Sequence, residues 1–116
     1  MTPTVLTYWG CSTCRKATAW LKAHGVAFNE RPIADEPPTM AELEKWVRAS
    51  GLPLKKWLNT SGLSYRALGK AKIDAASPET LMKWLSADGK LVKRPVLVAG
   101  KIVLVGFSEE AYGALF

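Results

Sequence analysis

The chain has 116 residues, of which 48% are hydrophobic and 22% charged, values that fit one globular domain over residues 1–116 and exclude a disordered protein. Its net charge of +6 is spread along the sequence without a run of five basic residues, so we expect a solvated basic surface or an anionic partner, and no direct DNA binding. No apolar run approaches the roughly 18 residues of a membrane span, and the stretch before the first apolar run is too short for a signal peptide, so we expect a cytoplasmic protein without membrane contact.

The first third of the chain predicts a strand, a helix and a second strand. Residues 5–9 combine β-branched, aromatic and aliphatic side chains, which are typical of a strand. A helical pattern follows over residues 11–24, with Ser12 or Thr13 as the expected N-cap. Residues 26–31 alternate apolar and polar side chains and predict the second strand. A β-α-β unit of this kind implies that the two strands run parallel.

The middle of the chain predicts several helical segments. Thr39 opens a capping box, the pattern that begins a helix. Shorter helical stretches are expected at residues 54–58 and 64–68. Ser77 caps a clearer helix, which has a proline at its first position. We therefore expect a helical insertion at about residues 39–87.

The end of the chain predicts a β-hairpin and a last helix. Residues 96–98 and 101–105 are two β-branched apolar runs that flank a turn. Ser108 is the expected N-cap of the final helix, which carries two glutamates in its first turn. The order of elements predicts an α/β protein with a thioredoxin-like fold, in which a mixed sheet of about four strands is interrupted by the helical insertion.

A cysteine pair, Cys11 and Cys14, stands where the first helix begins. The unpaired amides and partial positive charge of a helix N-terminus favour a thiolate at Cys11, and Arg15 adds to this effect if its side chain turns back. A spacing of three residues brings the two sulfurs close enough for a disulfide. Cys11 is then the exposed nucleophile, and Cys14 the shielded cysteine that resolves a mixed disulfide.

Two other interpretations of the pair stay open: buried structural thiols, or half of a metal site. Zinc usually takes four ligands. The only further candidate, His24, falls at the far end of the same predicted helix. We therefore expect no metal in this chain.

Three regions outside the pair are candidates for the same site. Arg94 precedes Pro95 at the first hairpin strand. One alternative is a cis proline that faces the cysteine loop, with Arg94 holding an anion or the thiolate; the other is an ordinary proline with a solvated arginine. Trp9 lies two residues before Cys11, where it would shape a substrate cleft. Asn59 belongs to a polar cluster that either lines the cleft or caps a turn.

Taken together, these segments resemble the ArsC-like family, which contains glutaredoxin-linked arsenate reductases and the Spx/MgsR-type regulators. The resemblance covers nearly the whole chain and implies the thioredoxin-like fold with a helical insertion. It rests on the segments WGCSTCRKA at 9–17, LNTSG at 58–62, YR at 65–66, KRP at 93–95 and VGF at 105–107.

Within that family, the sequence can be compared with the arsenate reductases and with the Spx/MgsR branch. The nucleophilic cysteine of the arsenate reductases matches Cys11, and one of their three oxyanion-binding arginines matches Arg94. The second arginine position falls at Asn59, and the third falls at residues 104–106, which contain no arginine. Since a dianion needs those charges, the sequence argues against arsenate reduction. The two cysteines and the VGF segment look more like the Spx/MgsR branch and related reductase-like members.

Two functions follow from the resemblance as expectations. The first is a thiol-disulfide oxidoreductase that acts with glutathione or a protein disulfide and needs no bound cofactor. The alternative is a redox-sensing transcriptional regulator of the Spx/MgsR type, which binds the RNA polymerase α-subunit. The candidate catalytic residues are Cys11, Cys14 and Arg94, and the candidate substrate-binding residues are Trp9, Gly10, Ser12, Thr13, Arg15, Asn59 and Pro95.

Overall fold

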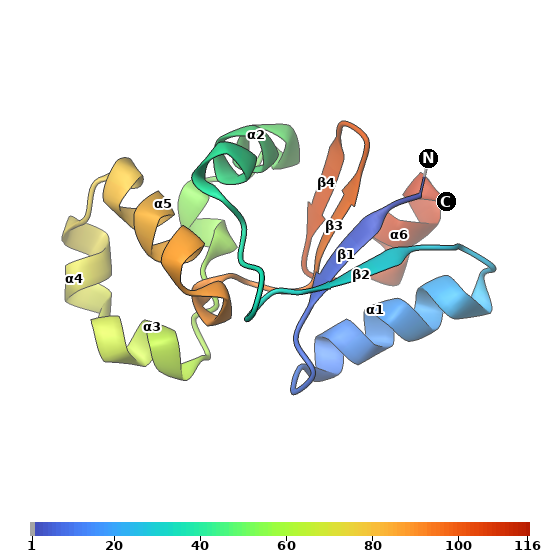
Figure 1. Cartoon of the computed structure of the whole chain (residues 1–116), viewed down its shortest axis with the longest axis horizontal. Coiled ribbons are helices and arrows are strands. Elements are labelled where there is room, and N and C mark those ends of the chain that lie inside the picture. The colour runs from blue at the N-terminus through green and yellow to red at the C-terminus, as the bar shows by residue number, and fades with distance from the viewer. Residues whose placement is uncertain (1) are drawn as a thin grey trace.

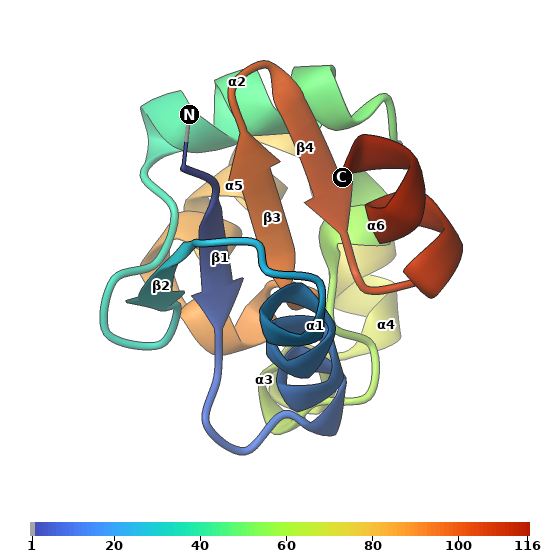
Figure 2. The same ribbon diagram turned by 90° about the vertical axis from the view of Figure 1, so that its right-hand side faces the viewer.

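The computed structural model describes residues 2–116 and shows a mixed sheet between two groups of helices (Figure 1). Its strands are β1 (Thr4–Thr7), β2 (Asn29–Pro32), β3 (Val96–Ala99) and β4 (Ile102–Val105). They lie in the order β2-β1-β3-β4, as Figure 2 shows. β1 and β2 are parallel, whereas β3 is antiparallel to both β1 and β4. The predicted mixed sheet of about four strands is therefore confirmed.

Helices α1 (Ser12–Ala23) and α6 (Glu109–Leu115) cover one face of the sheet. Because successive strand residues point to opposite faces, Val5 of β1 and its partner Leu97 of β3 share this face. Their side chains are fully buried with three helical residues. This smaller core consists of Val5, Ala17, Leu21, Leu97 and Tyr112.

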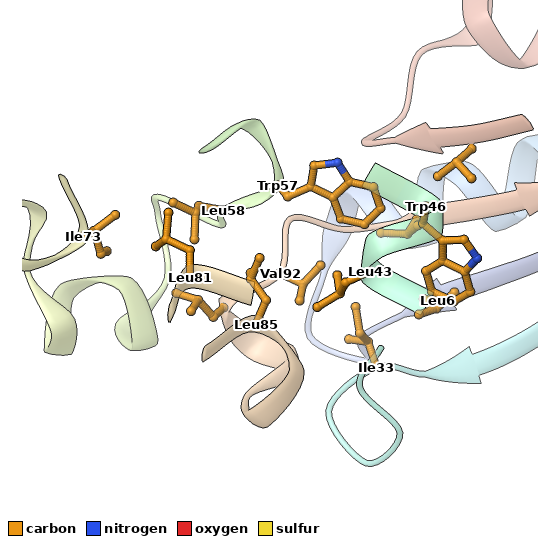
Figure 3. Close-up of a cluster of buried hydrophobic side chains, with 13 residues drawn as sticks. Leu6, Ile33, Leu43, Trp46, Trp57, Leu58, Ile73, Leu81, Leu85 and Val92 are labelled. Atoms are coloured by element: carbon orange, nitrogen blue, oxygen red, sulfur yellow. The ribbon is translucent and has the colours of Figure 1, made fainter. Parts of the chain in front are cut away.

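The other face of the sheet packs against the helical segments between β2 and β3. The larger core is built there, where β1 and β3 contribute Leu6 and Val96 and the insertion contributes Leu43, Trp57 and Leu85 (Figure 3). The segments are α2 (Met40–Ser50), η1 (Leu54–Trp57), α3 (Leu63–Leu68), α4 (Lys70–Ala75), α5 (Pro78–Ala87) and η2 (Gly89–Leu91).

Local polar signals determine the starts of three helices. Thr39 Oγ1 accepts a hydrogen bond from the Glu42 N–H at 3.1 Å, and the Glu42 carboxylate accepts one from the Thr39 N–H at 2.9 Å, which completes the predicted capping box. Ser77 and Ser108 cap α5 and α6 as expected. The Glu42 carboxylate also accepts two hydrogen bonds from Arg31, and this charged partner holds the pKa of the carboxyl below its usual value.

Several elements differ from the sequence-based prediction. β1 ends at Thr7 because the Cys11 N–H donates to the Tyr8 carbonyl at 3.0 Å, which closes a turn through residues 8–11. β2 begins only at Asn29, where its pairing with Thr4 of β1 starts, and the preceding Val26 and Phe28 pack against the smaller core without belonging to the strand. α4 was not predicted, and it begins without a side-chain cap. The N-cap of α1 is Cys11 itself, in place of the expected Ser12 or Thr13.

Among residues 2–116, the structure contains no helix that is both long enough and apolar enough to cross a membrane.

Candidate functional site

Cys11 occupies the loop that leads from β1 into α1. Its backbone is extended, with φ −101° and ψ 111°, so the residue stands just outside the helix. Its Sγ accepts a hydrogen bond from the Cys14 N–H at 3.1 Å. Sulfur is a weak acceptor and is absent from the preferred capping residues, which is why the sequence pointed to the neighbouring hydroxyls. The contact brings the sulfur against an amide at the start of α1, one of those that a helix leaves without an intrahelical partner.

Cys14 lies one turn further along and is only 2% exposed, whereas Cys11 is partly exposed. Burial raises the pKa of the Cys14 thiol to about 12, with a further contribution from its hydrogen-bonding contact with Cys11. Both cysteines are free thiols in the structure. The pair is therefore asymmetric: one sulfur is accessible at the helix start, and the other is buried and protonated at neutral pH.

We expect this asymmetry to appear in alkylation. At pH 7.5, iodoacetamide should label Cys11 alone, because a thiol with a pKa near 12 carries almost no thiolate at that pH and Cys14 is also screened from solvent. Peptide mass spectrometry after timed quenching measures the two rates, and unfolding in urea should make them similar. Equal labelling of both cysteines in the folded protein would contradict the assignment.

Cys11 faces a cleft of about 480 Å³. Residues from both ends of the chain and from the helical insertion line this cleft. Four of them are candidate site residues predicted from the sequence: Cys11, Thr13, Asn59 and Arg94. Its full lining is Cys11, Thr13, Asn59, Ser61, Lys93, Arg94, Leu104, Val105, Gly106, Phe107, Ser108 and Ala111.

Arg94 is held in place beside the cysteine pair. Its Nη1 donates to the Lys90 carbonyl at 3.1 Å, and its guanidinium lies 4.6 Å from the centre of the Tyr8 ring. Its Nε is buried and has no hydrogen-bond partner within residues 2–116. The positive charge also offsets part of the rise in the Cys14 pKa. Of the two alternatives for the next peptide bond, the structure shows the cis form at Arg94–Pro95.

The insertion reaches the cleft through a short antiparallel bridge between Leu58 and Val92. The Asn59 N–H donates to the Leu91 carbonyl at 2.8 Å, and the Lys93 N–H donates to the Trp57 carbonyl at 2.7 Å. This bridge sets residues 59–61 beside residues 93–94, although about thirty positions separate them in the sequence. Asn59 therefore lines the cleft, which is one of its two predicted roles.

Five candidate binding residues lie outside the walls of this cleft. Trp9 is 86% exposed and borders a different cleft, which is lined in part by Tyr8 and Glu30. Gly10 and Ser12 are exposed on the loop itself. Arg15 does turn back, but its Nη1 donates to the Trp9 carbonyl at 3.0 Å. Pro95 is buried and does not line the cleft.

Several cleft residues were missed because they come together only in the fold. Lys93 adjoins the predicted Arg94, yet no local pattern separates it from the other lysines. Ser108 was predicted only as a helix cap. Residues 104–106 were singled out through the family resemblance, and they lie in the same cleft as Cys11, Asn59 and Arg94. The three positions that the resemblance assigns to oxyanion-binding arginines therefore line the same cleft as Cys11, and only Arg94 is an arginine.

No metal centre is found in the described part of the chain, where His, Cys, Asp and Glu residues nowhere gather in threes. His24 instead stacks on Trp20 with ring centres 3.8 Å apart, and its Nδ1 lies 2.8 Å from the Trp20 carbonyl.

Comparison with known proteins gives a consistent result. The chain matches the ArsC family over residues 6–115. It is 44% identical over 108 residues to the uncharacterized protein YusI of Bacillus subtilis, covering 90% of this chain and 92% of that protein. It is 31% identical over 105 residues to the regulatory protein MgsR of the same organism, and the match covers 90% of this chain and 82% of MgsR.

Among solved structures, an ArsC family related protein from Bacteroides fragilis is 42% identical and superposes with a TM-score of 0.94, covering 100% of this chain and 98% of that one. The agreement extends through the sheet and the helical insertion. The fold is therefore thioredoxin-like, as the order of elements predicted.

Proposed function

This chain belongs to the ArsC family, and on that premise we propose that it is a thiol-disulfide oxidoreductase whose Cys11 attacks a disulfide and whose Cys14 resolves the product. The observation that carries the proposal is the asymmetry of the pair. Cys11 caps α1 with its sulfur at the cleft, and Cys14 is buried one turn behind it. A cytoplasmic location is part of the proposal, because cysteine pairs there serve redox chemistry more often than structure.

The reaction proceeds in two exchanges. The Cys11 thiolate forms a bond to one sulfur of the substrate disulfide, and the other half of the substrate leaves as a thiolate that takes up a proton. The Cys14 sulfur then attacks the Cys11 sulfur and expels the second half of the substrate as a thiolate, which takes up the proton that Cys14 loses. The substrate is reduced to two thiols, and the protein is oxidised to a Cys11–Cys14 disulfide. Two equivalents of an external thiol return the pair to the reduced state.

We propose glutathione as that external thiol. Lys93 and Arg94 line the cleft, and cationic side chains of this kind suit the carboxylates of the tripeptide. The family's arsenate chemistry is not part of the proposal, because Asn59 and residues 104–106 stand at two of the three arginine positions.

The test is a redox titration of the wild-type protein with defined ratios of reduced and oxidised glutathione, read by intact mass after acid quenching. We expect the main oxidised species to have lost two hydrogens, the signature of an internal disulfide, with a small population that carries one glutathione. A protein that stays reduced at every ratio would refute the oxidoreductase. A stable glutathione adduct without an internal disulfide would refute the resolving role of Cys14.

A second candidate function is a redox-dependent regulator that binds the RNA polymerase α-subunit. The observation that favours it is the 31% identity to the regulatory protein MgsR over 90% of this chain. The test is a pull-down in which the reduced and the oxidised protein each capture the purified C-terminal domain of the polymerase α-subunit. Binding that differs between the two states supports this function, and the absence of binding in both states excludes it.

A further inference from the structure

The cysteine cleft continues into a second cleft of about 430 Å³ that is rich in lysine. The two share Asn59, Ser61 and Lys93 as common walls. The second cleft adds two lysines from η1, Lys55 and Lys56. Within residues 2–116, no aspartate or glutamate lines either cleft. A continuous hollow of positive charge therefore leads away from Cys11.

We call this second cleft the lysine extension. Its lysines differ in whether a carboxylate lies close enough to balance their positive charge. Lys55 is paired with Asp74 at 3.1 Å. Lys56 and Lys93 form no ion pair with any part of the chain that the structure describes, and both are exposed. Together with the buried, unpartnered Nε of Arg94, they leave the hollow with positive charge that the described residues do not neutralise.

The position of Lys93 is fixed by its surroundings. Its backbone N–H donates to the Trp57 carbonyl at 2.7 Å, which anchors it to the end of η1. Its side chain lies against Gly106. If residue 106 carried a Cβ, that atom would lie 3.5 Å from Lys93 Cε and 4.0 Å from Lys93 Nζ. Gly106 has φ +81°, a conformation that suits glycine. The ammonium group of Lys93 thus lies at the junction of the two clefts.

We propose that the two clefts form one binding site for a small disulfide with negatively charged groups on both sides of its sulfur pair. Arg94 binds the negative group nearer to Cys11, and Lys56 and Lys93 in the lysine extension bind the farther one. The size supports a small molecule, since ligand pockets of about 300–1,000 Å³ are usual. The inference rests on the proposed oxidoreductase function and adds the charge class of its substrate.

The test compares three small disulfides of different charge: 3,3′-dithiodipropionate, the neutral bis(2-hydroxyethyl) disulfide and the cationic cystamine. Because their leaving thiols also differ in pKa, each rate is divided by the rate of the same disulfide with the urea-unfolded protein. The rate of oxidation of the reduced protein is measured for each by quenched intact mass at low and moderate salt. We expect this normalised rate to be highest for the anionic disulfide and lowest for cystamine, and we expect the difference to shrink as salt screens the charges.

Lys56→Gln and Lys93→Gln should each lower the ratio of the rate with dithiodipropionate to the rate with the neutral disulfide by about threefold to tenfold. Lys101→Gln, an exposed lysine in the β3–β4 turn, serves as the matched control and should change none of the three rates. Unchanged rates with dithiodipropionate in both cleft variants would overturn the inference, as would an equal fall with the neutral disulfide. Failure of all three disulfides to oxidise the wild type would overturn the oxidoreductase itself.

Discussion

Replacement of Cys11 by serine should lower disulfide exchange by on the order of 10³-fold or more, because a serine hydroxyl does not ionise at neutral pH and cannot attack a disulfide. The fold should survive the change. Cys11 is partly exposed, and serine is a good N-cap that can accept the same hydrogen bond from the Cys14 N–H. The measurement is the rate of oxidation by bis(2-hydroxyethyl) disulfide, with circular dichroism as the control for folding.

Cys14 variants give the complementary result. Cys14→Ser should still react with the disulfide at Cys11, but the mixed disulfide should then persist, since no second sulfur lies at the helix start. Intact mass should show one half of the substrate bound to the protein. Cys14→Ala controls for the cost of a hydroxyl at a buried position and should behave in the same way. Rapid release of the substrate half by either variant would show that Cys14 is not the resolving residue.

The features of the fold and of the site that the sequence predicted correctly are those whose residues lie close together in the chain. Cys11 and Cys14 were found because a strand, a pair of cysteines and a helix follow one another directly in the chain. The helix caps at Thr39, Ser77 and Ser108 were found because each cap directly precedes its helix and accepts a hydrogen bond from an N–H only three positions along the chain. Such signals need no knowledge of the tertiary fold.

The parts that were missed depend on pairing between distant segments. The Leu58–Val92 bridge brings Asn59 and Lys93 together. No short sequence pattern predicts an isolated β-bridge between segments so far apart in the chain. Trp9 was expected in the substrate cleft because of its place in the sequence. The turn closed by the Tyr8 carbonyl and the Cys11 N–H separates it from the cleft walls. Neighbours in sequence can face different sides of a loop, and only the backbone path decides between them.

Gly89 is the residue at which we expect the largest loss of stability. It begins η2 and packs so closely against the end of β2 that an added Cβ would lie 1.8 Å from the Ile33 carbonyl oxygen and 2.6 Å from the carbonyl carbon. Both are backbone atoms, so no side-chain rotation relieves the overlap. Gly89→Ala should therefore cost about 3 kcal/mol or more in the free energy of unfolding, a value at the upper end of overpacking effects.

The measurement is urea unfolding followed by tryptophan fluorescence, with Gly113→Ala as the matched control. Gly113 lies within α6, where the nearest atom to an added Cβ is 4.0 Å away, so this change should be neutral or stabilise the protein by about 0.5–1 kcal/mol. A Gly89→Ala variant as stable as the wild type would mean that η2 and β2 are not in contact.

Gly89→Ala should also change the shape of the cysteine cleft, because η2 carries backbone carbonyls that hold cleft residues in place. The Lys90 carbonyl accepts hydrogen bonds from Arg94 Nη1 and Asn59 Nδ2, and the Leu91 carbonyl accepts one from the Asn59 N–H. A shift of η2 away from Ile33 would displace both acceptors. In any folded fraction of Gly89→Ala, the preference for dithiodipropionate over the neutral disulfide should therefore fall, whereas Gly113→Ala should retain it. A retained preference would show that the cleft keeps its shape independently of η2.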